Sequence, residues 1–169
     1  MRKWLVIPVV VLVLAVGLPR PAGATAPTEY HATYTLNLAS VTVTSHRAAG
    51  GNAFTSMAYQ ARLSGDITGP VTATEDDVTH ADGTTNLHGM FTCACTVADH
   101  SGHVTMKYVG AAYMVQATIR GTRVTRIAVA GVDVVVHGTG GLATLHGQGP
   151  FWGHDNVVTK DLFLHFGPS

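Results

Sequence analysis

Apolar and polar residues alternate one by one along most of this chain, and this pattern constrains the fold more than any other feature. Between Glu29 and Leu38 the tyrosines, alanine and leucines fall on one face, and histidine, threonines and asparagine fall on the other. The same period of two returns over residues 54–63, 87–97, 104–108, 113–119 and 157–166. This period is typical of a strand with one buried face, and no stretch shows a capped helical period. We therefore predict an all-β domain of about eight to ten short strands.

The first 26 residues have the pattern of a secretory signal peptide. Arg2 and Lys3 precede an apolar run from Leu5 to Leu18, and small residues follow in AGATA, at 22–26. The run is shorter than the roughly 20 residues that a membrane span needs, so we expect cleavage after Ala24 or Ala26 rather than an anchor. We accordingly expect residues 27–169 to form one secreted domain that has no membrane contact after cleavage.

The mature chain carries little charge. Removal of Arg2, Lys3 and Arg20 shifts the formal charge from +0 for the whole chain to about −3 for the rest. A nucleic-acid-binding surface needs a basic patch, so we expect no nucleic-acid partner. The chain has no nucleophile elbow, P-loop, metalloprotease helix or aspartic dyad. We therefore expect no cofactor and lean away from an enzyme.

A glycine-rich stretch from Gly138 to Trp152, GTGGLATLHGQGPFW, follows the apolar run VDVVV at 132–136. We expect the first three glycines of this stretch to adopt positive φ in a tight reversal, and Gly147 and Gly149 to leave room for a neighbouring side chain or a cavity. Interrupting glycines also let a sheet coil, which favours a closed antiparallel β-barrel of about eight strands over a sandwich. We expect the leucines to plug one end of this barrel and the glycines to shape its corner: Gly138, Gly140, Gly141, Leu142, Leu145, Gly147 and Gly149.

Two motifs resemble a known family. The segment VVVHGTGGLATLHGQGPF (134–151) resembles the closing hairpin of allene oxide cyclase and dirigent-like barrels, and more closely an uncharacterised bacterial family of the same barrel type. That family also carries an early G-D-I-x-G segment, which LSGDITGP (63–70) matches. The resemblance implies a small barrel with an apolar lumen that holds a small molecule. It also implies trimers or dimers, so a homo-oligomer is one expectation.

The alternation indicates which side chains would face such a lumen. The expected ligand-lining side chains are Tyr34, Met57, Tyr59, Phe91, Tyr108 and Val134. Asp133 and His137 are the ionisable candidates for a catalytic acid–base pair, because a spacing of four places both on one strand face. The leading hypothesis is a binder of an apolar small molecule, and the alternative is an isomerase or cyclase that uses Asp133 or His137.

Cys93 and Cys95 are the only cysteines and support two further interpretations. An exported protein favours a disulfide, but residues i and i+2 of an extended strand lie about 6.6 Å apart, so the bond would need a local distortion. Otherwise the two are buried thiols. With His100 and His103 they could instead form a metal-binding module, although this spacing is not a standard one.

The acidic run Glu75-Asp76-Asp77 is the last candidate site, in this case for calcium. Its oxygens are consecutive rather than spaced as in a calcium loop. We interpret the run as polar decoration of a strand end.

Overall fold

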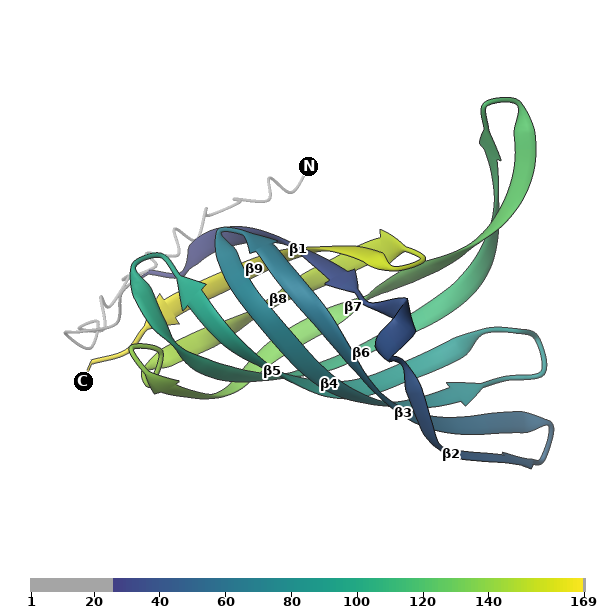
Figure 1. The fold of residues 1–169 in the computed structure, drawn as a ribbon, viewed down its shortest axis with the longest axis horizontal. Coiled ribbons are helices and arrows are strands. Elements are labelled where there is room, and N and C mark those ends of the chain that lie inside the picture. The colour runs from purple at the N-terminus through teal and green to yellow at the C-terminus, as the bar shows by residue number, and fades with distance from the viewer. Residues whose placement is uncertain (1–25, 169) are drawn as a thin grey trace, which may run out of the picture.

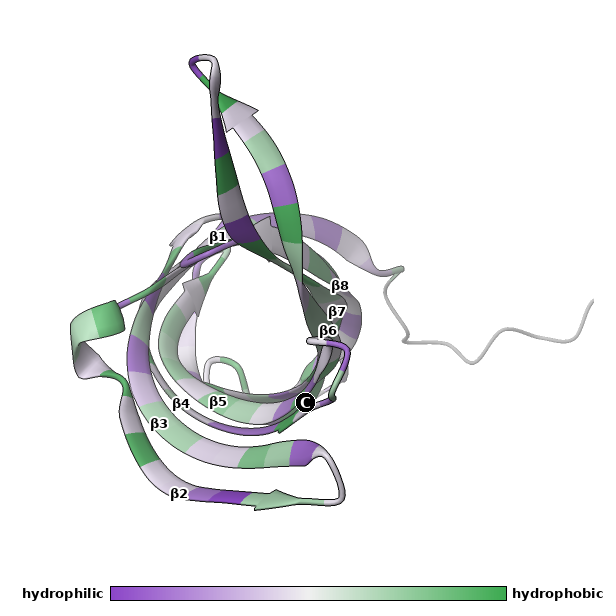
Figure 2. Ribbon diagram, turned by 90° about the vertical axis from the view of Figure 1, so that its right-hand side faces the viewer, coloured by the Kyte–Doolittle hydropathy of each residue, from purple (hydrophilic) through white to green (hydrophobic). Residues whose placement is uncertain are grey.

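Residues 26–168 are described by a computed structural model, and they form one antiparallel sheet of nine strands that closes into a ring (Figures 1 and 2). The predicted all-β class is therefore confirmed. The strands are β1 (Thr28–Leu36), β2 (Thr42–Ala49), β3 (Asn52–Gly65), β4 (Ile67–Thr79), β5 (Thr85–Val97), β6 (His100–Ile119), β7 (Thr122–Gly140), β8 (Leu145–His154) and β9 (Val157–Phe166). In this part of the chain no helix has the length and apolar character needed to cross a membrane. The predicted signal peptide falls almost entirely outside the described residues.

The ring closes because β1 pairs with two strands. On one side it pairs with β9, and on the other it pairs with the end of β3, where Tyr34 lies opposite Leu63. From β3 to β9 each strand pairs with the next one in sequence, always antiparallel. Eight strands thus form the ring, and β2 lies beside the first half of β3 outside it.

A short 3-10 turn, η1 (Leu38–Ser40), takes the chain out of the ring between β1 and β2. Asn37 caps this turn by accepting a hydrogen bond from the Ala39 backbone N–H. The Ser40 hydroxyl accepts a hydrogen bond from the Gln60 backbone N–H at 2.8 Å, which ties the turn to β3. The corner coincides with a shift of the apolar phase after Ala39 in the sequence.

Strands β6 and β7 are longer than the short strands expected. Each runs without interruption, and together they extend as a hairpin well beyond the ring (Figure 1). Gly131 does not break β7 but pairs with Gly110 of β6. The Phe151 ring of β8 occupies the space that side chains at these two glycines would fill. The glycines therefore make room for an aromatic ring inside a continuous sheet.

The interior of the ring is apolar and is sealed at one end. Inward-facing residues alternate along every strand of the ring and form a single core. Leu142 and Leu145, from the β7–β8 connection, are 0% and 2% exposed. They pack into the core at the end of the ring that holds the β3–β4, β5–β6 and β7–β8 turns, as expected of a plug.

The glycines of the β7–β8 corner serve close approach more than unusual dihedral angles. Of the three expected to adopt positive φ, only Gly140 does so, at 62°. A side chain on Gly138 would collide with the Leu142 carbonyl oxygen. Gly147 and Gly149 were expected to leave room for a side chain or a cavity, but the backbone of β9 lies against them instead. These glycines therefore let β8 and β9 approach closely.

Cys93 and Cys95 are joined in a disulfide on the inner face of β5, and both residues are buried. Their Cα atoms are 5.2 Å apart, less than the roughly 6.6 Å of a regular strand. The strand is therefore locally compressed, which is the distortion that this bond requires.

We expect Leu142→Ala to lower the free energy of unfolding by about 2–5 kcal/mol, because the fully buried side chain would leave a cavity at the sealed end. Urea denaturation followed by circular dichroism measures this change. Leu38→Ala is the control, since Leu38 is 64% exposed and its replacement should change the value by less than about 0.5 kcal/mol. Equal effects of the two substitutions would contradict a plugged end.

Candidate functional site

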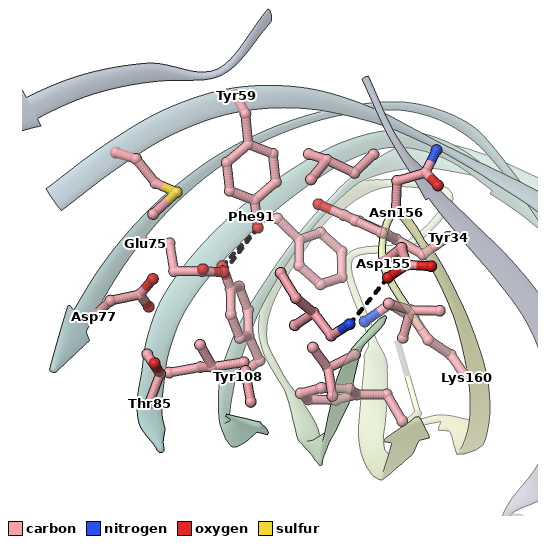
Figure 3. A pocket seen from close by; sticks show the side chains of 18 of the residues that line it. Tyr34, Tyr59, Glu75, Asp77, Thr85, Phe91, Tyr108, Asp155, Asn156 and Lys160 are labelled. Atoms are coloured by element: carbon pink, nitrogen blue, oxygen red, sulfur yellow. Dashed lines mark hydrogen bonds between the residues drawn. The ribbon is translucent and has the colours of Figure 1, made fainter. Parts of the chain in front are cut away.

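A cavity of about 290 Å³ lies inside the ring toward the end opposite the leucine plug. Its rim includes Thr79 and Thr85 of the β4–β5 hairpin and Asp155 and Asn156 of the β8–β9 turn. Aromatic and aliphatic side chains form most of its wall, and a few polar groups converge within it (Figure 3). Small-molecule sites in proteins combine these features.

Five of the six residues predicted to face a lumen line this cavity. They are Tyr34, Met57, Tyr59, Phe91 and Tyr108. The sixth prediction is wrong, because Val134 points outward and is 41% exposed. Its neighbour Asp133 faces inward, and successive residues of a strand point to opposite faces.

The predicted pairing of Asp133 with His137 on one face is also wrong. The register between β6 and β7 shifts so that Thr105 lies opposite His137 and Met106 lies opposite Val135. Val136 is the additional residue of this bulge, and a bulge reverses the alternation beyond it. His137 is consequently exposed on the outside, while Asp133 is completely buried inside.

Asp133 forms a buried ion pair with Lys160 of β9. The Lys160 Nζ donates to Asp133 Oδ2 at 2.7 Å, and the two side chains are 5% and 0% exposed. Burial raises the pKa of Asp133 and lowers the pKa of Lys160, while the charge of each partner opposes these shifts. Lys160 lines the cavity and Asp133 does not. The carboxylate therefore holds the lysine in place from behind.

Three aromatic rings surround the ammonium group of Lys160. Its Nζ lies 4.9 Å from the ring centre of Tyr34, 5.0 Å from that of Phe91 and 4.8 Å from that of Phe151. Ring faces attract a cation, and more strongly where water is excluded. The positive charge is thus satisfied by one carboxylate and by aromatic faces.

A second polar cluster lines the cavity, and its side chains come from β3, β4 and β6 (Figure 3). The hydroxyls of Tyr59 and Tyr108 both donate to Glu75 Oε2, the former at 3.0 Å, and the two hydroxyls are 2.8 Å apart. The Tyr108 ring fills the space that a side chain at Gly89 of β5 would need. Burial, with Glu75 contributing, raises the pKa of both tyrosines, which keeps them protonated as donors.

Two polar atoms at the cavity have no hydrogen-bond partner among residues 26–168. One is the Tyr34 hydroxyl, whose residue is 6% exposed, and the other is Oδ1 of Asp77. Burial is the main reason that the pKa of Asp77 is raised to about 8, and the negative charges of Glu75 and Asp76 add to the shift. These atoms are available to a molecule that enters the cavity.

Glu75, Asp77 and Lys160 were not identified as lumen residues from the sequence. The acidic run was interpreted as decoration of a strand end, but β4 continues through it to Thr79. The signal was present, because the inward face of β4 runs from Ile67 to Ala73 in steps of two and leads to Glu75 and Asp77. In β9, Lys160 follows Val158 by two positions and therefore lies on the same inward face.

The groups considered for metal binding do not converge in this structure. Both cysteine sulfurs are used in the disulfide, and the exposed ring of His100 stacks on Phe166 at 4.4 Å between ring centres. Among the described residues, the ligand atoms of Glu29, His31 and Asp161 lie within 4.8 Å of one another on the outer surface. There His31 Nδ1 and Asp161 Oδ1 form an ion pair at 2.7 Å.

Comparison with known proteins adds no assignment. No family model and no curated protein matches the chain. The site must therefore be interpreted from its own geometry.

We expect the buried ion pair to show strong coupling in a double-mutant cycle. Asp133→Leu or Lys160→Met alone should cost about 3–5 kcal/mol, because each leaves one buried charge unpaired. The double variant should cost less than either single one, because no charge then remains. Arg126→Met is the control, since the Arg126–Asp155 pair is more exposed and such pairs contribute about 0–1 kcal/mol. Additive losses, measured by urea denaturation, would contradict this coupling.

We also expect Asp77 to make stability fall with rising pH. Its folded pKa is about 8 against an ordinary value of 3.8, so the folded state binds the extra proton between these values. The unfolding free energy of the wild type, relative to Asp77→Asn, should therefore decrease from pH 4 to pH 8. All other titrating groups are present in both proteins, so the difference reports the loss of the Asp77 carboxyl group. The outward-facing variant Asp76→Asn should keep most of the wild-type slope, because Asp76 makes the smallest contribution to the shift of the Asp77 pKa. A constant difference between wild type and Asp77→Asn would refute the prediction.

Proposed function

We propose that this protein binds an apolar small molecule in the cavity inside its ring of strands. The observation that carries the proposal is an aromatic and aliphatic wall, enclosed by the sheet, that contains two polar atoms without partners. A core that served only stability would fill this space with side chains, as the opposite end does with Leu142 and Leu145.

The proposed architecture is a closed barrel of the allene oxide cyclase and dirigent-like type. Support comes from the ring of eight antiparallel strands and from the place of the glycine-rich motif at the corner that seals one end. Small barrels of eight strands either fill their interior or hold one small ligand. A cavity at one end and a plug at the other are consistent with the second case.

We propose that the protein works outside the cytoplasmic membrane. The residues that suggest export belong to the N-terminal 26, and the disulfide of β5 is consistent with an oxidising compartment.

Ligand binding is favoured over the isomerase or cyclase alternative. The two groups named for acid–base chemistry do not reach a bound molecule, because His137 lies on the outside and Asp133 lies behind Lys160. Glu75 does reach the cavity, but it accepts two tyrosine hydroxyls and is engaged with them.

We expect the neutral fluorescent probe N-phenyl-1-naphthylamine to bind with a Kd in the micromolar range, given roughly −0.3 to −0.5 kcal/mol per heavy atom. Met57→Trp should weaken this binding at least tenfold, because the larger ring occupies the cavity. Val134→Trp places the same ring on the outer face and should leave the Kd unchanged. Fluorescence titration measures both values, and circular dichroism checks the fold of both variants. Absence of binding to the wild type, or equal binding by the two variants, would overturn the proposal.

A further inference from the structure

The charges that face the cavity do not balance. Lys160 is paired with Asp133, and Asp155 at the rim is paired with Arg126 at 2.8 Å. Glu75 and Asp77 remain, and within residues 26–168 neither forms an ion pair with a cationic side chain. The wall formed by β4 therefore carries two carboxyl groups without an ion-pair partner, and among these residues only the charge of Lys160, which is already paired with Asp133, acts on Glu75 from a distance.

Charged side chains on the neighbouring strands do not supply a counter-charge. His88 of β5 and Lys107 of β6 are exposed on the outer face of the sheet. Asp76, between the two inward carboxyl groups, also points outward and accepts a hydrogen bond from Ser56. Half-buried carboxylates without a counter-charge are unfavourable, so these surroundings favour a proton on Asp77. A cation that enters the cavity can replace that proton.

The surroundings of the two carboxyl groups suit an ammonium group. Tyr59 and Tyr108 line the cavity beside Glu75 (Figure 3), and aromatic rings together with carboxylates are a favourable environment for organic cations. The Tyr34 hydroxyl, buried and without a partner among the described residues, lines the same cavity and can accept a further N–H. An aliphatic part of the wall is formed by Leu36, Leu87 and Val129 among others.

We propose that the ligand of this cavity is a protonated amine on an apolar body, with its ammonium group at Glu75 and Asp77 and its body against the aliphatic wall. This inference rests on the proposed function and narrows it to one chemical class. An anionic ligand such as a fatty acid carboxylate would meet the two carboxyl groups, and Lys160, the one cation that the described residues place in the wall, is already paired.

The first test compares three molecules with one hydrocarbon body, n-octylammonium, 1-octanol and octanoate, as displacers of N-phenyl-1-naphthylamine. Octylammonium should bind at least tenfold more tightly than octanol, and octanoate should bind most weakly. The affinity for octylammonium should also increase as the pH rises from 6 to 8, since binding releases the Asp77 proton. Equal or tighter binding of octanol or octanoate would overturn the amine proposal.

The second test uses two neighbouring variants. Asp77→Asn should remove most of the preference for octylammonium over octanol, measured as the ratio of the two Kd values within the same variant. Asp76→Asn removes an equal charge from the outer face and should keep the preference. Equal loss in both variants would show that general surface charge, rather than the cavity, selects the amine.

The two proposals fail in distinguishable ways. If the naphthylamine probe does not bind the wild type, the proposed binding function is wrong. If the probe and the octyl compounds bind without a preference for the ammonium group, the function stands and the amine proposal alone is wrong.

Discussion

Pairing between β1 and β3 is the constraint on which the rest of this structure depends. Without it the sheet would have free edges at β1 and at the end of β3, and its two faces would be equally open to water. With it, eight strands enclose one interior, and every residue of the ring is assigned to the inside or the outside. The chain leaves the ring at η1, directly after this pairing, and β2 then pairs with the other half of β3.

Because the ring is closed, polar residues that face inward are shielded from bulk water and need partners inside it. Lys160 and Asp133 form an ion pair, and aromatic rings surround the ammonium group of Lys160, so this pair is part of the packed interior. Glu75 and Asp77 lie nearer the open end, where the wall retains a cavity and no cation from residues 26–168 forms an ion pair with them. The Lys160–Asp133 pair shows how a charge is tolerated in this core. Glu75 and Asp77 give the cavity an acidic side that a ligand can recognise.

Much of the fold could be predicted from the sequence, because a period of two reports directly on strands with one buried face. It identified the all-β class, the leucines at the sealed end and five residues of the cavity wall. It was wrong in several places, for different reasons. A bulge at Val136 turned His137 outward, and Val134 was assigned to the lumen although regular alternation places it on the face opposite to Asp133. Glu75 and Asp77 were missed because the acidic run was interpreted as the end of a strand, and Lys160 was not considered.

The sequence by itself determined that this chain forms strands, where they turn and which apolar residues are buried, because these properties depend on neighbours one or two positions apart. Only the tertiary structure decided that Tyr59, Glu75 and Tyr108 meet, that Lys160 reaches Asp133, and that one end of the ring is open while the other is filled. These contacts join residues 16 to 33 positions apart. They exist because antiparallel strands in a closed sheet bring distant inward-facing residues together around a single interior.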